Sequence, residues 1–238
     1  MNTKLFPVRG RAVVILILAV LLIWPAQILA VDANSTAAKD VNSAGIAELK
    51  PIQLPKPQTD GGKPLMQALK DRKTSRAFST EKLPDQVLSN MLWAACGINR
   101  PDGKRTAPTA VNWQEIDVYV ATAEGLYLYD AKEHSLKPIF AGDIRAATGR
   151  QPFVKDAPVN LVFVADFSKM GNAPADQKDF YAATDTGFVS QNVYLYCASE
   201  GLATVVRGAI DKPAMAQLMK LRLDQKVILA QTVGYPKK

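Results

Sequence analysis

The feature that most constrains the fold is a long segment near the C-terminus, which predicts a single helix from about Asp176 to Glu200. Its second half carries little charge, so most of its surface is suited to burial. Gly201 follows directly, and glycine commonly ends a helix because it adopts the left-handed backbone conformation without strain. We therefore expect this helix to be the buried central element of the domain.

Shorter apolar patterns predict a group of strands with helices before and after it. Predicted strands cover residues 116–120, 126–129, 136–140, 159–165, 205–206 and 227–233, and predicted helices cover 64–72, 84–96, 143–148 and 211–219. The strand at 159–165 is almost wholly apolar, which is typical of a central position in a sheet. Strands grouped in this way indicate an α+β fold and not a βαβ repeat.

The N-terminus has the layout of a secretory signal peptide. A positively charged stretch precedes an uninterrupted apolar run from Ala12 to Trp24, and small residues follow it. We predict a signal peptide over residues 1–30, with cleavage after Ala30 or as late as Ala33, and export to the bacterial periplasm. A retained membrane anchor is the alternative, although the run is short for a span of roughly 20 apolar residues.

The next segment, residues 31–63, is polar and contains three prolines and a pair of glycines near its end. It predicts a linker followed by an extended arm, and not an element of the core. Residues 64–238 have the length of one domain.

Charge and composition exclude several classes of protein. The formal charge is +7, and removal of the three cations in residues 1–30 leaves +4, with no basic run, which argues against nucleic-acid binding. His134 is the only histidine and falls in a predicted polar turn, which argues against a Ser-His-Asp hydrolase and against a histidine zinc site, and no metal is expected. Cys96 and Cys197 sit in apolar helical patterns and are predicted to be buried free thiols, with a disulfide as the alternative.

A cationic segment follows the first predicted helix. It holds three cations and two hydroxyls in consecutive positions: Arg72, Lys73, Thr74, Ser75 and Arg76. Guanidinium groups and hydroxyls match phosphate oxygens, so this segment predicts a phosphate-bearing ligand. A solvated basic turn is the alternative.

Four motifs follow one another along the chain: Leu54-Pro55 with Gly61-Gly62 and then Ala68–Phe78, Ala107–Asn112, the segment from Asp185-Thr186-Gly187 to Thr204, and Val233–Pro236. In this order and spacing they resemble the FMN-dependent nitroreductase superfamily and, within it, the SagB-type (thiazole/oxazole oxidase-like) branch. The resemblance covers roughly Pro55 to Pro236. It implies a nitroreductase-like fold with a mixed or antiparallel central sheet flanked by helices, and a homodimer with FMN at the subunit interface.

The resemblance also implies a role for individual residues in binding FMN. Arg72 and Lys73 would approach the phosphate and ribityl chain, and Thr74 would lie near the ring or the ribityl group. Arg76 would lie against N1 and the C2 oxygen, where a cation stabilises the reduced flavin.

The remaining implied contacts lie farther along the chain. The partner subunit would contribute Pro108, Thr109 and Asn112 to the isoalloxazine. Asn112 could instead serve only as a turn residue before a strand. Gln151 would face the pyrimidine edge, and the backbone N–H groups of Arg207 and Gly208 would lie near N5.

The function implied is an exported FMN-dependent oxidoreductase that moves electrons through flavin N5, to or from a small electron-poor substrate such as a nitroaromatic or a quinone. The electron donor and the catalytic side chains are not identified by the sequence. Two departures from the family pattern favour one alternative, a non-catalytic flavin-binding or scaffold protein, and the second of them argues against the other alternative, a SagB-type dehydrogenase of a modified peptide. The chain stops at Lys237-Lys238, where many relatives carry a further basic residue, and Lys178–Tyr181 lacks the adjacent Lys-Tyr pair of azoline dehydrogenases.

Overall fold

The structure is a computed structural model that describes residues 48–238. The predicted signal peptide and most of the predicted linker therefore lie outside the described residues. The helices are α1 (Leu65–Asp71), α2 (Asp85–Cys96), α3 (Ala175–Glu200) and α4 (Lys212–Leu218), with 3₁₀ turns η1 (Ala110–Asn112), η2 (Arg145–Thr148), η3 (Pro152–Lys155) and η4 (Phe167–Met170). The strands are β1 (Ile52–Gln53), β2 (Ile116–Ala121), β3 (Gly125–Asp130), β4 (Ser135–Ala141), β5 (Val159–Asp166), β6 (Ala203–Arg207) and β7 (Gln225–Gly234).

The seven described strands form one sheet in the order β1-β4-β3-β2-β5-β7-β6. Every strand pair in this part of the chain is antiparallel, which confirms an antiparallel sheet within an α+β fold. All eight residues of β5 are buried, as the continuous apolar run predicts for a central strand.

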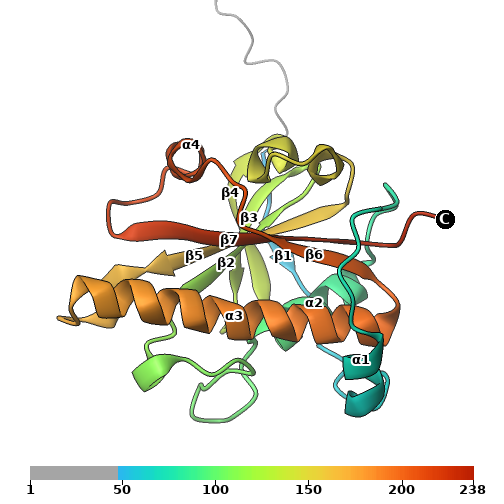
Figure 1. Cartoon of the computed structure of the whole chain (residues 1–238), viewed down its shortest axis with the longest axis horizontal. Helices are drawn as coiled ribbons and strands as arrows, with labels where there is room; N and C mark the ends of the chain where they lie inside the picture. Colours follow the sequence, from blue (N-terminus) through green and yellow to red (C-terminus); the bar gives the residue numbers. More distant parts are fainter. Residues whose placement is uncertain (1–47) are drawn as a thin grey trace, which may run out of the picture. The chain divides into compact units, whose positions relative to one another are not determined.

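Helices cover both faces of the sheet, with α3 crossing one face and α4 lying on the other (Figure 1). Because successive side chains of a strand point to opposite faces, β2 supplies both cores. Val118 and Val120 pack in the core that includes α2 and α3. Tyr119 and Ala121 pack in the second core, with the α4 side chain of Met215.

Helix α3 forms as predicted, and Gly201 ends it with a φ of 71°. The prediction that α3 is a buried central helix is confirmed for one of its faces. One face is buried, but Phe180 is 63% exposed and Phe188 is 43% exposed. Low charge on this helix therefore reflects a second apolar face that the described residues do not cover.

The arm before α1 contributes to the core, contrary to the prediction. Strand β1 pairs with β4 at the edge of the sheet, and Leu54 is only 4% exposed within the larger core. The arm is polar in composition, so a single buried leucine gave no periodic pattern by which to recognise it.

His134 lies in the predicted turn, where its ring also has a structural role. Its Nε2 lies 2.7 Å from the Ser89 hydroxyl and 3.1 Å from the Pro55 carbonyl, and its Nδ1 lies 2.9 Å from the Tyr129 hydroxyl. Because a carbonyl can only accept, Nε2 carries the proton and Nδ1 accepts from Tyr129. Burial lowers the pKa of His134, which keeps the ring neutral as a structural link between the arm, α2 and β3.

Both cysteines are free and buried, which confirms that prediction. Within residues 48–238, no helix has the length and apolar character needed to cross a membrane.

Candidate functional site

The cationic segment leaves α1 in an extended conformation and runs beside β6. The Ser75 amide donates to the Thr204 carbonyl at 3.0 Å, and Phe78 forms a β-bridge with Pro236. The segment is therefore held between the start of β6 and the C-terminal tail, two elements that lie far from it in sequence.

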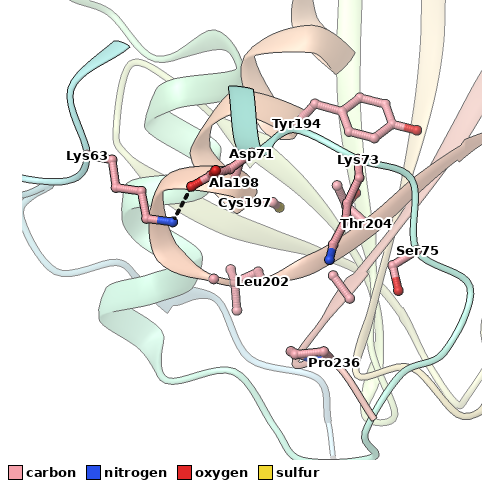
Figure 2. A pocket seen from close by; sticks show the side chains of 12 residues that line it. Lys63, Asp71, Lys73, Ser75, Tyr194, Cys197, Ala198, Leu202, Thr204 and Pro236 are labelled. Carbon is pink, nitrogen blue, oxygen red and sulfur yellow. Dashed lines mark hydrogen bonds and ion pairs between the residues drawn. The ribbon is translucent and has the colours of Figure 1, made fainter. Parts of the chain in front are cut away.

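A cleft of about 510 Å³ opens where this segment meets the C-terminal end of α3. Its polar lining includes Lys63, Lys73, Ser75, Tyr194 and Thr204. Figure 2 shows the side chains of Lys73 and Ser75 beside Thr204, with Lys63 and Asp71 at the opposite side of the cleft. The volume falls within the roughly 300–1,000 Å³ typical of small-ligand and cofactor sites.

The predicted side chains of the segment point in different directions, because alternate residues of an extended chain face opposite ways. Lys73 and Ser75 line the cleft, whereas Arg76 is exposed. The Arg72 guanidinium carbon lies 5.5 Å from the centre of the Tyr194 ring, and the Thr74 hydroxyl lies 3.0 Å from the Tyr194 hydroxyl. The cluster thus presents one cation to the cleft and two to other surfaces.

Tyr194 is a residue that the sequence did not single out. Its hydroxyl accepts a hydrogen bond from the Val206 amide at 3.0 Å and also meets Thr74, so it joins α3, β6 and the cationic segment. Nothing in the sequence separates it from Tyr196 in the same helix, whose hydroxyl donates to the Val87 carbonyl at 3.2 Å.

The electrostatics of the cleft favour an anionic ligand. Lys63 pairs with Asp71 at 2.8 Å, and the hydrogen bond from Lys63 lowers the pKa of Asp71. Lys73 forms no salt bridge with any residue of 48–238, so its ammonium is available to a phosphate. This donor set, an ammonium and a hydroxyl in a cleft with flanking arginines, fits the phosphate of FMN.

The predicted contacts Pro108, Thr109 and Asn112 lie on a tight turn at another point along α3. The Thr109 hydroxyl accepts from the Gln114 amide at 3.0 Å, and the Asn112 side-chain oxygen accepts from the Gln114 side chain at 3.1 Å. Asn112 has a φ of 58°, so in the single chain it acts as the turn residue that was the alternative reading.

The turn and the cationic segment are separated in one chain. Asp185 holds the turn and Tyr194 holds the segment, and at 1.5 Å per residue these two helix positions lie roughly 13 Å apart along α3. The described chain alone does not bring Pro108, Thr109 and Asn112 to Arg72 or Arg76.

The Arg207 side chain has a structural function. It is 4% exposed and donates to the Thr232 hydroxyl at 3.0 Å, the Thr148 carbonyl at 2.6 Å and the Asn160 side-chain oxygen at 3.0 Å. Burial lowers its pKa to about 10, so it stays charged at neutral pH. Only the backbone N–H groups of Arg207 and the exposed Gly208 remain for the predicted contact near N5, which stays a prediction.

Gln151 lies close to this guanidinium. An ideal Cβ on Gly149 would stand 1.8 Å from Arg207 Nη1 and 3.0 Å from Gln151 Oε1, so any side chain at Gly149 would collide with them. The Gln151 oxygen is buried and has no hydrogen-bond partner within the described chain. It is an acceptor that a donor on a bound ligand, or a small rotation of Arg207, would satisfy.

The C-terminal lysines lie apart from the cleft. Lys237 and Lys238 line a second hollow with Ser79 and Glu81, and only Pro236 and Gly201 are shared with the first. A role for Lys237 and Lys238 in binding the phosphate stays a prediction. Over residues 48–238, no three histidine, cysteine, aspartate or glutamate side chains are grouped to hold a metal ion.

Comparison with known protein families matches residues 69–235 to the Nitroreductase family. The chain belongs to the nitroreductase family. A solved structure from Ralstonia eutropha JMP134, provisionally named a nitroreductase, is 44% identical with a TM-score of 0.76, and the match covers 79% of this chain and 90% of that one.

Two named relatives extend the comparison. MJ1384 of Methanocaldococcus jannaschii, provisionally named a nitroreductase, is 29% identical over 63% of this chain and 81% of its own length. The FMN reductase [NAD(P)H] of Bacillus subtilis is 24% identical over 72% of this chain and 66% of its own length. These matches do not distinguish the SagB-type branch from the rest of the family.

Proposed function

We propose that this nitroreductase-family protein is an exported FMN-dependent oxidoreductase that acts on a small electron-poor substrate such as a nitroaromatic or a quinone. The observation that carries the proposal is the placement of Lys73 and Ser75 in the cleft beside β6, on the segment that also bears Arg72 and Arg76. A relative named FMN reductase supports the choice of cofactor.

The residues of the segment would share the work of holding FMN. Lys73 and Ser75 would bind the phosphate, and Arg72 and Thr74 would be kept in place by Tyr194. Arg76 would place a positive charge beside N1 and the C2 oxygen, where it favours the reduced cofactor. Bound FMN supplies the redox chemistry, taking up electrons from a donor and passing them to the acceptor through N5.

A homodimer would complete the site. Large apolar side chains are exposed on α1, η1 and α3: Leu65, Met66, Leu69, Val111, Phe180 and Phe188. A second subunit would cover this surface and could bring its own Pro108–Asn112 turn to the cationic segment, which the single chain cannot do.

Export limits the choice of electron donor. The predicted signal peptide would deliver the protein to the periplasm, where soluble nicotinamide is not expected. We therefore favour a quinol or a periplasmic redox protein as the donor.

The experiment that tests the proposal is purification of the protein from the periplasm, followed by absorbance spectroscopy and mass spectrometry of any released ligand. Flavin absorbance, or uptake of added FMN with a defined dissociation constant, is expected. A colourless protein that does not take up FMN would refute the cofactor assignment. Turnover of a nitroaromatic or quinone by the dithionite-reduced protein would exclude a non-catalytic flavin-binding or scaffold protein.

Oxidation of a modified peptide is the less supported activity. Lys178 has no adjacent tyrosine, and its ammonium donates to the carbonyls of Gly171 at 2.7 Å and Phe167 at 3.2 Å. A lysine used in this way closes the loop before α3. We expect the protein to leave azoline-containing peptides unchanged.

A further inference from the structure

Glu115 is a buried carboxyl group without a hydrogen-bond donor. Its exposure is 0%, and neither side-chain oxygen has a hydrogen-bond partner among residues 48–238. Its backbone is fixed, because its carbonyl accepts from the Asp166 amide at 2.9 Å where β2 begins beside the end of β5. The side chain therefore starts from a fixed backbone position and lies wholly in the interior.

The side chain that faces Glu115 is the carboxylate of Asp185 on α3. Asp185 is 1% exposed and lies within hydrogen-bonding reach of Glu115. Two ionised carboxylates in contact and away from water repel each other strongly, and a proton on Glu115 relieves this repulsion. Burial, with the Asp185 charge as a further cause, raises the pKa of Glu115.

The same aspartate holds the turn that carries Pro108, Thr109 and Asn112. Asp185 Oδ2 accepts from the Ala110 amide at 2.9 Å. The turn needs such a restraint, because Val111, Asn112 and Gln114 have φ values of 50°, 58° and 50°. A β-branched residue in this left-handed region is strained by roughly 1–2 kcal/mol.

The other charged groups in this region are paired with groups other than Glu115. Lys169 on η4 attracts the Glu115 carboxylate, but its ammonium is bonded to Asp117 Oδ1 at 2.6 Å. Asp166 is paired with Arg222 at 2.8 Å, and Arg105 donates to the Gln114 side chain at 3.0 Å. Within residues 48–238 no cation donates to either side-chain oxygen of Glu115, so a proton on Glu115 is the group that relieves the repulsion from Asp185.

We propose that Glu115 holds a proton that it donates to Asp185 and that the two side chains together position the Ala110–Trp113 turn, so that loss of this proton loosens the turn. In the protonated form the Glu115 hydroxyl donates to Asp185, the pair carries one negative charge, and Asp185 keeps its bond to Ala110. Loss of the proton leaves two negative charges in contact, and separation of the carboxylates moves Asp185 away from the Ala110 amide.

The effect of this proton on turnover rests on the proposed function, because the turn would reach FMN from the partner subunit. Glu115 and Asp185 are positioning residues under this proposal and do not touch the cofactor. The turn would be ordered for binding only in the protonated state of the pair, so FMN affinity would fall as pH rises through neutrality.

The test follows the turn itself in the FMN-free protein. The amide signal of Ala110 and the indole signal of Trp113 are recorded by NMR between about pH 5 and pH 9, a range that brackets the neutral region. We expect both signals to shift together with one midpoint near neutrality. Glu115→Gln, which keeps a donor facing Asp185, should abolish the shift, while the exposed carboxyl variant Glu81→Gln should leave it unchanged.

A measurement without substitution guards against a variant that does not fold. In protein labelled with ¹³C at glutamate side-chain carboxyls, the Glu115 signal should titrate at the same midpoint as Ala110. A midpoint in the ordinary glutamate range, or turn signals that titrate unchanged in folded Glu115→Gln protein, would overturn the proposal. These measurements use the protein without flavin. A failure to bind FMN in a separate experiment would therefore refute the proposed function without affecting the result for Glu115.

Discussion

The Thr74 hydroxyl lies 3.0 Å from the hydroxyl of Tyr194, and this contact joins the cationic segment to the long helix. The Tyr194 hydroxyl also accepts from the Val206 amide at 3.0 Å, so one side chain fixes the spacing between α3, β6 and the segment. A site assembled in this way depends on a residue that need not touch the ligand phosphate.

Removal of the Tyr194 hydroxyl should therefore affect stability and ligand binding together. We expect Tyr194→Phe to lower the free energy of unfolding by about 1–2 kcal/mol, because the Val206 amide loses its acceptor. Urea denaturation measures this change. Tyr181→Phe is the matched control, since within residues 48–238 the Tyr181 hydroxyl forms no hydrogen bond, and equal losses in both variants would contradict the prediction.

Arg76 tests the predicted cation beside the flavin. Arg76→Ala should weaken FMN binding by roughly 1.5–3 kcal/mol if the guanidinium makes a charge-assisted hydrogen bond. Fluorescence titration of FMN gives the dissociation constant. Lys132→Ala, an exposed cation on the β3–β4 turn, should not change it, and an unchanged constant in Arg76→Ala would remove this residue from the site.

Arg207 should stabilise the fold through its buried hydrogen bonds. We expect Arg207→Met to cost about 2–4 kcal/mol, because the Thr148 carbonyl and the Asn160 side chain lose their donors inside the protein. The exposed Arg150→Met, on the loop between η2 and η3, is the control and should lie within about 0.5 kcal/mol of the parent. Guanidinium denaturation measures the free energy of unfolding of both variants, and equal values would contradict the prediction.

The raised pKa of Glu115 predicts a specific pH dependence of stability. Burial raises this pKa from the ordinary 4.5 to about 7, so between these values the folded state binds more protons than the unfolded state. The free energy of unfolding should therefore fall as pH rises through this window, by at most roughly 3 kcal/mol, and level off above it.

The measurement is urea denaturation across that pH window for the parent protein and for Glu115→Gln. The variant should lose this part of the slope and should be the more stable of the two at the alkaline end. Identical slopes in the two proteins would show that Glu115 does not bind a proton preferentially in the folded state. Glu81→Gln, an exposed change of the same kind, should reproduce the parent slope.

Local sequence patterns were sufficient for much of the secondary structure. The apolar character of 159–165 predicted central β5, and the end of α3 at Gly201 followed from a glycine that adopts positive φ. The cationic segment was also recognisable, because five consecutive residues carry its chemistry. In each case the signal lies in neighbouring residues, whose backbone preferences and charges do not depend on distant parts of the chain.

The tertiary structure alone decided which distant residues meet. The edge pairing of β1, the burial of Arg207 and the contact between Glu115 and Asp185 join residues widely separated in sequence. A glutamate just before a strand or an aspartate on a helix looks like any solvated carboxyl until packing removes water from both. The sequence by itself determined most of the helices and strands and the cation-rich segment, and only packing of the sheet against α3 decided which charges are buried and which face a ligand.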